Sequence, residues 1–517
     1  MTRTITAALL AATALASVPA HAQSSGEDGY AANDIIVTAR RREENLQDVP
    51  IAISAISQEA LQQRQIGTEL DLQRTVPGLT IRQNYTNSPP GVLTYTNEAQ
   101  VVSRAASSFF DLSGIQVLKG PQGTLFGRNA TGGAVLFETA RPGDASEGYL
   151  LARYGNYDLA RVEGAVSLPL AEDIGLRLAG YYENGGAFVK NVRTGKRLGK
   201  QDLGAMRATL VIRPGEGIEN RTVVQHTREG GTNVSTQVYS AYACGQTFNG
   251  VPLNSTADCV YGPADVFGGF GFYTAANPNI FPGGVDAAAD RQRAWGPWKT
   301  ESGVPIYHKA RSTFVVNTTE LDLSSDLKLK NIFNGDRSNG DGCYTYDGTP
   351  YFIFTIFGTP SPGLTTLTDT QGFVQKTRQV SNELQLQGEA FGGKLDYVLG
   401  AYFLDQKDEN DSSLLAFDLS PVAAGSALRY RALTTAASRA MFGQGTYAVT
   451  DRLNLTAGLR WSWEKVTSKQ LPGSVFGTAA PKEVLKDDKP SWTVSLDYKL
   501  ADDVLLYVAH RGSWRAG

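Results

Sequence analysis

The chain is 517 residues long, which exceeds one ordinary globular core and requires several domains or one very large architecture. Its formal net charge of -3 provides no basic surface of the kind that binds nucleic acid, so we exclude that class of partner. Beyond the N-terminal segment no apolar run reaches about 18 residues, which excludes helical membrane spans.

Glycine and aromatic residues are abundant, with 55 Gly, 22 Tyr and 21 Phe. This composition is typical of a β-rich wall with aromatic girdles, although large soluble β-sandwiches share it.

Residues 1–22 have the pattern of a secretory signal peptide. Arg3 provides a positive start, the stretch from Ile5 to Ala16 is apolar, and Ala20-His21-Ala22 is a small-residue cleavage site. The sequence therefore predicts export.

Export permits disulfide bonds, and Cys244 and Cys259 are close enough in sequence to close one small loop. Cys343 is then left over, either as a free thiol or as the partner of a cysteine outside this chain.

Residues that carry enzyme chemistry are sparse beyond residue 22. Only His226, His308 and His510 lie there, and they form no H-E-x-x-H motif. No G-x-S-x-G elbow occurs, and the cysteines lack C-x-x-C spacing. We expect no enzyme activity, no protein-bound metal and no cofactor.

A tether is predicted for residues 23–44. Residues 23–33 are small and polar, with little to bury. The next six, Asp34 to Ala39 (DIIVTA), are β-prone, and we interpret the charge run Arg40 to Glu44 as keeping them soluble.

A small α/β domain is predicted for residues 45–143. Val49 to Ser54 alternates like a strand, whereas Ser57 to Gln65 follows a helical period with Ser57 as a candidate N-cap.

After Pro142 the sequence repeats every two residues. Leu455, Leu459 and Trp461 alternate with polar residues such as Arg460, so one face is apolar and the other polar. Segments end alternately in tight turns, such as Gly392-Gly393, and in long loops, about 230–307 and 337–376. Short connections at one end of the strands and long connections at the other are typical of antiparallel outer-membrane barrels. We count roughly thirteen strands in this part of the chain.

Several motifs, in the same order along the chain, resemble the TonB-dependent receptor family. Asp34, Ile35, Ile36, Val37, Thr38 and Ala39 resemble the TonB box, here called the box. The other matching segments are Val76 to Leu79, Leu118 to Ala134, Ser381 to Leu386, Leu395 to Gly400 and Tyr507 to Gly512. The resemblance covers essentially the whole chain.

This resemblance implies a mainly β fold, in which an N-terminal α/β plug domain fills a transmembrane β-barrel. Physically, a β-prone box on a tether can add as a strand to a periplasmic partner and carry a pull. The implied partners are a TonB-type energy transducer, outer-membrane lipid and an iron-siderophore or similar ligand.

The glycine-rich run fits neither nucleotide-binding glycine motif, so we assign its glycines to tight backbone geometry. The plug-motif residues are Lys119, Gly120, Pro121, Gln122, Gly123, Gly127, Arg128, Asn129, Gly132 and Gly133. By resemblance, a basic residue at the position of Lys119 pairs with an acidic residue of the wall. Glu383 is the candidate partner, although a solvated carboxylate facing the lumen fits it equally well.

Two departures from the family pattern are expected to matter. Between Arg82 and Val102 the plug is shorter than in the family. Residues 147–517 provide about 13 of the 22 strands of such barrels, so we expect a partial barrel, truncated at the C-terminus. An unclosed sheet leaves unpaired backbone groups at its edges, which is costly in hydrocarbon.

The function predicted from the sequence is energy-coupled uptake of a scarce ligand by an outer-membrane receptor, with ferric siderophores as the expected ligand class. Carbohydrates, cobalamin and aromatic degradation products use the same scaffold in the family. Two alternatives remain open: a passive porin or adhesin, and a non-functional remnant.

Overall fold

The computed structural model describes residues 36–42, 44–80, 92–102, 109–234, 237, 247–248, 251–252, 270–272, 284–302, 306–343, 354–356, 373–414, 428–474, 482–501 and 504–515. The predicted signal peptide, Asp34, Ile35, Cys244 and Cys259 lie outside these residues. All statements below concern the described part of the chain.

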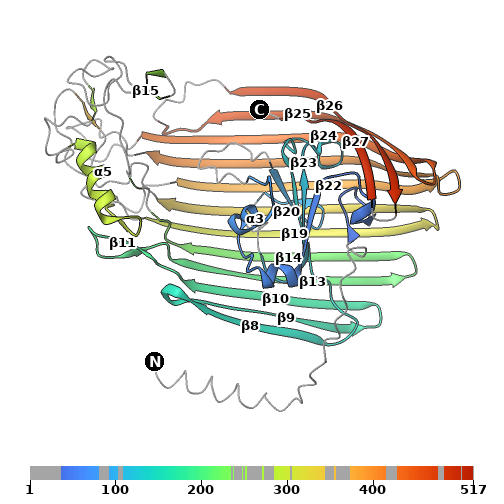
Figure 1. Ribbon diagram of the computed structural model, residues 1–517, viewed down its shortest axis with the longest axis horizontal. Coiled ribbons are helices and arrows are strands. Elements are labelled where there is room, and N and C mark those ends of the chain that lie inside the picture. Colours follow the sequence, from blue (N-terminus) through green and yellow to red (C-terminus); the bar gives the residue numbers. More distant parts are fainter. Residues whose placement is uncertain are drawn as a thin grey trace, which may run out of the picture.

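One curved antiparallel sheet of thirteen strands dominates the structure (Figure 1). Its strands follow one another in sequence order, from β8 at one edge to β27 at the other. They are β8 (Glu147–Gly155), β9 (Leu159–Ala171), β10 (Ile174–Gly185), β13 (Gln201–Gly215), β14 (Ile218–Gly231), β19 (Tyr307–Ser324), β20 (Leu327–Cys343), β22 (Phe373–Ala390), β23 (Leu395–Leu414), β24 (Leu428–Thr450), β25 (Leu453–Gln470), β26 (Glu483–Ala501) and β27 (Val504–Gly512). This sheet, called the wall below, confirms the predicted mainly β fold and the strand count.

The two faces of the wall differ as the two-residue repeat predicts. On β25, Leu459 and Trp463 are exposed on the outer face, while Arg460 and Glu464 are buried on the inner face. Successive side chains of a strand point to opposite faces, so apolar residues at alternate positions form a continuous outer surface. The inner face is polar.

The connections of the wall are sorted by end. One end carries tight turns, for example between β19 and β20 and between β24 and β25, and the opposite end carries the long connections. The strands extend further than predicted beside the second long loop, since β20 continues to Cys343 and β22 begins at Phe373. Elements in the long connections are β11 (Val189–Asn191), β12 (Arg197–Leu198), β15 (Thr247–Phe248), β16 (Val251–Pro252), β17 (Phe270–Phe272), α5 (Gly284–Trp295), β18 (Lys299–Thr300) and β21 (Phe354–Ile356).

The N-terminal domain lies against the inner, concave face of the wall (Figure 1). Its five-stranded sheet has the order β3-β6-β7-β4-β5, and β4 pairs parallel with β7. The elements are β3 (Ile53–Ser57), α2 (Gln58–Gln63), α3 (Glu69–Thr75), β4 (Val92–Thr96), β5 (Ala99–Gln100), β6 (Leu112–Lys119), α4 (Gly123–Phe126) and β7 (Gly133–Thr139).

Local sequence explains the two longer helices of this domain. Ser57 Oγ accepts a hydrogen bond from the Ala60 amide, and Thr68 Oγ1 accepts one from the Asp71 amide, so each helix begins at a capped turn. The predicted Ser57 cap is confirmed, but the strand expected at Val49 to Ser54 begins only at Ile53. Val76 and Leu79 are buried after α3.

Two strands had no counterpart in the sequence interpretation. β4 and β5 lie inside the stretch interpreted as a shortened plug loop, part of which is outside the described residues. They form the edge of the N-terminal sheet that approaches the wall.

No helix in the described part of the chain combines the length and the apolar character needed to cross a membrane.

Candidate functional site

The four described residues of the box, 36–39, are folded against the N-terminal domain. Ile36 and Val37 form β1 (Ile36–Val37), which pairs antiparallel with β2 (Glu44–Asn45). Val37 and Ala39 are buried in a core that includes Leu118 and Phe126 of the N-terminal domain. The box must therefore leave this position before it can add as a strand to another protein.

Thr38 is held by the central sheet of the N-terminal domain. Its amide donates to Gln116 Oε1 at 3.0 Å, and Gln116 Nε2 donates to Thr38 Oγ1 at 3.4 Å. Because Gln116 lies on β6, the box is joined directly to the middle of the domain.

Arg41 is the central residue of the site. It lies in the turn after the box with a φ of 64°, and its side chain is only 2% exposed. A left-handed conformation is uncommon outside glycine, so the surrounding contacts must hold it in place.

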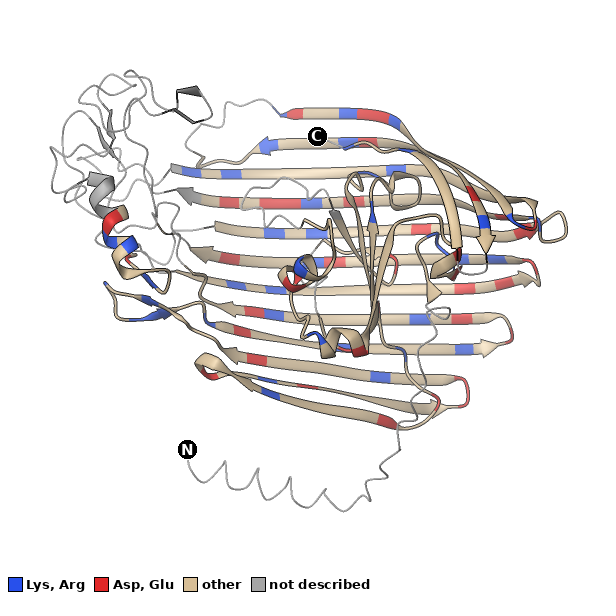
Figure 2. Ribbon diagram, in the orientation of Figure 1, with Lys and Arg blue, Asp and Glu red and all other residues tan. Residues whose placement is uncertain are grey.

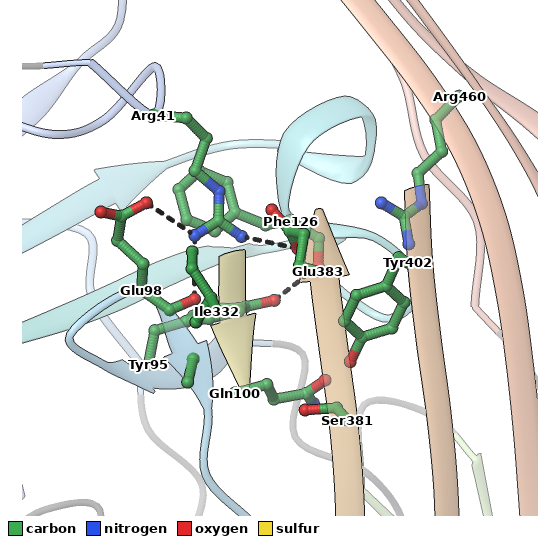
Figure 3. A pocket seen from close by; sticks show the side chains of 11 residues that line it. Arg41, Tyr95, Glu98, Gln100, Phe126, Ile332, Ser381, Glu383, Tyr402 and Arg460 are labelled. Carbon is green, nitrogen blue, oxygen red and sulfur yellow. Dashed lines mark hydrogen bonds and ion pairs between the residues drawn. The ribbon is translucent and has the colours of Figure 1, made fainter. Parts of the chain in front are cut away.

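The Arg41 guanidinium joins the N-terminal domain to the wall (Figure 3). Nη1 donates to the Glu98 carbonyl at 2.8 Å and lies 3.3 Å from Glu98 Oε2, whereas Nη2 lies 3.3 Å from Glu383 Oε2 on β22. Its carbon centre is 4.7 Å from the Phe126 ring centroid. The two carboxylates come from opposite sides of the interface.

The wall supplies further charges around this ion pair. Lys330 Nζ on β20 binds Glu98 Oε1 at 2.5 Å and Glu320 Oε1 at 3.1 Å. Gln385 Nε2 donates to Glu383 Oε1 at 2.6 Å, and Gln387 Nε2 donates to the Arg41 carbonyl at 2.9 Å. Positive and negative groups therefore alternate in the order Lys330, Glu98, Arg41 and Glu383. The first and last belong to the wall, and the two between them belong to the N-terminal part of the chain.

These contacts set the ionisation of the domain's buried groups. Burial opposes the charge on Arg41, but Glu383 and Glu98 raise its pKa above the ordinary value. Burial alone would raise the pKa of Glu98, yet Lys330 and Arg41 hold that pKa below its ordinary value. Burial raises the pKa of Glu138, and Arg221 offsets only part of that effect.

The cavity at this interface is small, about 20 Å³, and is lined by Arg41, Tyr95, Glu383, Tyr402 and Arg460 among others. Small-molecule sites are usually at least ten times larger. The arrangement is therefore a contact between two parts of the protein and not a ligand pocket.

The glycine-rich segment makes a second contact with the wall. Gly127 adopts a φ of 79° and a ψ of -158°, a conformation that is essentially restricted to glycine. A Cβ added there would lie 3.0 Å from Arg460 Nη2 on β25. A Cβ at Gly123 would lie 2.5 Å from Ser513 Oγ and 2.7 Å from Ser491 Oγ.

Other members of the same segment also reach the wall or hold its turn. Arg128 Nη1 pairs with Glu464 Oε2 at 3.1 Å, and the Asn129 amide donates to the Trp514 carbonyl at 3.2 Å. Inside the segment, the Gly120 amide donates to the Gly132 carbonyl, and the Gln122 amide to the Ala130 carbonyl. The first of these bonds closes the turn that contains Pro121.

A third contact lies near the other edge of the wall. Asp111 accepts hydrogen bonds from Arg177 Nε at 3.0 and 3.1 Å and also binds Nη2, while Arg207 Nη1 donates to the Asp111 carbonyl at 2.8 Å. Asp111 and Arg207 are buried. The contacts made by Arg41, by the glycine-rich segment and by Asp111 thus hold the N-terminal domain to three different places on the wall.

Family models match both parts of the chain. A model of the TonB-dependent receptor plug domain matches residues 45–134, and a model of the TonB-dependent receptor-like β-barrel matches residues 247–517, more than half of the chain. The chain belongs to the TonB-dependent receptor family. This family consists of transport receptors of the outer membrane.

Two curated receptors are similar to parts of this TonB-dependent receptor. The pesticin receptor of Yersinia pestis is 24% identical over 215 residues, which span 37% of this chain and 30% of that receptor. The probable TonB-dependent siderophore receptor PiuA of Acinetobacter baumannii is 26% identical over 132 residues, spanning 23% of this chain and 18% of PiuA. The matched stretches thus cover less than a third of either relative.

A solved structure agrees in fold. The crystal structure of the ferric yersiniabactin uptake receptor FyuA from Yersinia pestis superposes with a TM-score of 0.65 at 17% identity. It covers 89% of this chain and 64% of the FyuA chain. The N-terminal domain is thus the plug and the wall is barrel sheet.

The plug residue that pairs with Glu383 differs from the sequence interpretation. We expected Lys119, but no ion pair joins these two described residues, and Glu383 pairs with Arg41. Lys119 is the last residue of β6, opposite Gly133 of β7. A Cβ at Gly133 would lie 2.2 Å from the Leu118 carbonyl oxygen, so this close approach explains the glycine.

The charge run after the box was also misinterpreted. Only Arg40 and Arg42 of its arginines are partly exposed, and Arg42 Nη1 pairs with Asp396 of the wall at 2.6 Å. Arg41 is buried. No local sequence signal marks Arg41 as the buried member of this run, because its partners Glu98 and Glu383 lie far away in the sequence.

Three further interface residues were missed, namely Glu98, Lys330 and Arg460. They lie on segments far apart in the sequence, and nothing local marks them. Cys343, which the sequence left unpaired, is a buried free thiol at the end of β20.

Proposed function

We propose that this protein is an energy-coupled uptake receptor for ferric siderophore-type ligands in the Gram-negative outer membrane. A TonB-type energy transducer would pair with the box as an added strand and pull it. Export would use residues 1–22 as the signal peptide. The ligand class is supported by the two similar receptors and the similar structure, whose names refer to siderophores, pesticin or ferric yersiniabactin.

One observation carries the proposal: Arg41 lies two residues beyond the box and joins the plug to the wall. A pull on the box would act on the Thr38–Gln116 hydrogen bonds and, three residues further along the chain, on Arg41. Withdrawing Arg41 separates it from Glu383 and leaves two carboxylates facing Lys330 and Arg460. Among the described residues, the Arg41–Glu383 pair is the ion pair to the wall that lies nearest the box in sequence, so we expect it to break first.

A backbone substitution in the box tests the coupling. In Ile35→Pro the strand lacks an amide that a ladder hydrogen bond needs, while Ser25→Pro places the same residue in the tether ahead of the box. We expect Ile35→Pro to abolish uptake of a radioactive ferric siderophore into cells and Ser25→Pro to leave it intact. Equal uptake by Ile35→Pro and wild type would support passive diffusion and contradict the proposal.

A further inference from the structure

A small three-stranded sheet, called the loop sheet below, lies among the long connections of the wall (Figure 1). It contains β11 and β12, from the connection between β10 and β13, and β18, from the connection between β14 and β19. β11 pairs antiparallel with β12 and parallel with β18. Two long connections that are far apart in the sequence thus form one folded unit.

The buried face of the loop sheet fixes its position. Val189 and Leu198 pack with Ile306 in a small apolar core. Asn191 is 2% exposed, and its Nδ2 donates to the Ser302 carbonyl at 2.9 Å. Because buried polar groups need their hydrogen bonds, this contact holds the two connections in one arrangement.

The opposite face carries a row of cations. The register places Arg197 of β12 opposite Lys190 of β11, and Lys190 opposite Lys299 of β18. All three side chains are exposed, whereas the residues next to them in each strand are buried. Neighbouring strands are about 4.8 Å apart, so the three charges stand side by side. Like charges directly opposite one another destabilise a sheet.

The protein itself does not neutralise this row. Residues 186–200 contain three further cations, Arg193, Lys196 and Lys200, and no acidic residue. Among the described residues these six cations form no ion pair, since carboxylates of adjoining segments pair elsewhere: Glu301 with Arg291 at 3.9 Å and Asp202 with Arg228 at 3.6 Å. Figure 2 shows Lys and Arg positions, in blue, along the hairpin of β11 and β12. A bound polyanion would relieve the repulsion.

Aromatic rings lie beside the row. Trp298 directly precedes Lys299 and is 59% exposed, and its carbonyl accepts a hydrogen bond from the Lys190 amide at 2.9 Å. The Phe188 ring centroid lies 5.8 Å from that of Trp298 and 6.0 Å from that of Tyr157, which is 54% exposed. Exposed rings next to cations suit an acidic sugar, whose apolar C–H face stacks on a ring while its carboxylate pairs with a cation.

We propose that the loop sheet binds a polysaccharide of uronic acids outside the cell, so that the protein also acts as an adhesin. Successive carboxylates of the chain meet Arg197, Lys190 and Lys299, and Trp298 stacks on one of the sugar rings. The guanidinium group binds a carboxylate through paired hydrogen bonds, and the lysines add charge.

The size of the surface favours a narrow chain over a folded protein as the partner. A stable protein–protein interface covers about 800 Å² on each side, whereas the loop sheet has three strands of two or three residues. The long connections of outer-membrane barrels are extracellular, which leaves this face open to polysaccharide. The inference does not depend on the transported ligand or on energy coupling.

Binding of a fluorescent oligogalacturonate to the detergent-solubilised full chain, followed by fluorescence anisotropy, tests this surface. The comparison probes are its neutral methyl ester, a polyglutamate and a polyphosphate of the same length. The test variant combines Lys190→Gln, Arg197→Gln and Lys299→Gln. The control removes the same charge at the tight-turn end of the wall, with Arg213→Gln, Lys394→Gln and Arg452→Gln.

Two further variants separate charge, stacking and folding. Lys190→Arg combined with Lys299→Arg keeps the positive row, so it should bind the oligogalacturonate like the wild type. Trp298→Ala keeps the charge and removes the ring, so we expect roughly threefold to tenfold weaker binding.

We expect the wild type and the control to bind the oligogalacturonate, and the test variant to bind it roughly tenfold to hundredfold more weakly. The methyl ester should bind the wild type no better than the acid binds the test variant. Equal binding by the test and control variants, or equal binding of acid and ester, would overturn the proposal. Tighter binding of polyglutamate or polyphosphate would also overturn it, since the surface would then suit an acidic protein or a phosphate polymer. The assay involves no uptake, so its result is independent of the Ile35→Pro comparison.

Discussion

Arg41 forms an ion pair with Glu383 although 342 residues separate them in the sequence. One residue belongs to the turn behind the box and the other to the middle of the barrel wall. The contact makes the position of the box depend on the state of the plug–wall interface, and it can be tested from both sides.

Replacing Glu383 by Gln should release the box. Removing one partner of a buried ion pair is strongly destabilising, but Glu98 still faces Arg41, so we expect about 2 kcal/mol, or roughly a 30-fold larger opening constant. A reporter is Val37→Cys, fully buried in the closed state, in a background with the natural cysteines replaced by Ser. Its rate of thiol modification should rise accordingly.

The matched control for this variant is Glu389→Gln on the same strand. Glu389 is 48% exposed and pairs with Arg42 at 3.5 Å, so its loss should change the rate by less than about threefold. If both variants label Val37→Cys at the same rate, the Arg41–Glu383 pair does not hold the box.

Gly127→Ala should weaken the glycine-rich contact by two separable effects. The backbone conformation costs about 1–3 kcal/mol, and the new Cβ meets Arg460 at 3.0 Å. We expect Arg460→Gln to relieve only the second effect, so Gly127→Ala should cost about 1 kcal/mol less in that background. The difference is measured from the free energies of unfolding in urea of four proteins: the wild type, Gly127→Ala, Arg460→Gln and the double variant. Strict additivity would show that the two residues do not touch.

Acid should release the box through Glu98. Because the pKa of Glu98 is lower in the folded protein than in the unfolded chain, its contribution to docking is complete above the unfolded value, about 4.3, and is lost as pH falls through the folded value. Glu138 has the opposite sign, since its raised pKa makes protonation favour the docked state. Modification of Val37→Cys by an acid-tolerant thiol reagent should accelerate below pH about 4.

Glu98→Gln is the control for this acid effect. It should label faster than wild type at neutral pH and show much less acceleration in acid, because the titrating group is gone. An unchanged acid profile in Glu98→Gln would assign the effect to other groups.

Asp111→Asn should loosen a different part of the interface. The carboxylate of Asp111 binds the Arg177 guanidinium through two of its nitrogens, and the neutral amide loses that charge pair, at a cost of about 2–4 kcal/mol. Amide hydrogen exchange of β6 and β7 should accelerate near residue 111, while labelling of Val37→Cys stays unchanged. Ser113→Ala removes only an exposed 3.3 Å hydrogen bond to the Glu138 carbonyl of β7, so it should change both measurements far less than Asp111→Asn. Faster Val37→Cys labelling in Asp111→Asn would show that the plug docks as one unit.

The sequence predicted the repetitive parts of the fold well. Alternation such as that of Leu459 and Arg460 depends only on which face each residue takes, and it gave the wall, its strand number and the sorting of its connections. The capped helix at Ser57 was also predicted because its signal is local. The strands β4 and β5 were missed, since their pairing with a distant β7 decides their structure.

The candidate site was predicted only in part, for the same reason. The box, the glycine-rich segment and Glu383 carry family-like motifs, and Glu383 lies at the plug–wall interface. Its partner could not be predicted, because burial of Arg41 depends on where the chain turns after Ala39 and on residues more than fifty positions away. Charge runs are usually solvated, and only the fold reveals that this one is not.

We propose that the box and Arg41 leave their docked position during uptake. The most direct test joins Thr38→Cys on the box to Gln116→Cys on β6, which are hydrogen-bonded partners in the native protein, with a short cleavable thiol cross-linker in cells. We predict that cross-linking stops uptake of the radioactive ferric siderophore and that cleavage of the linker restores it, while each single-cysteine variant treated in the same way transports normally. Undiminished uptake by the cross-linked protein would contradict the account.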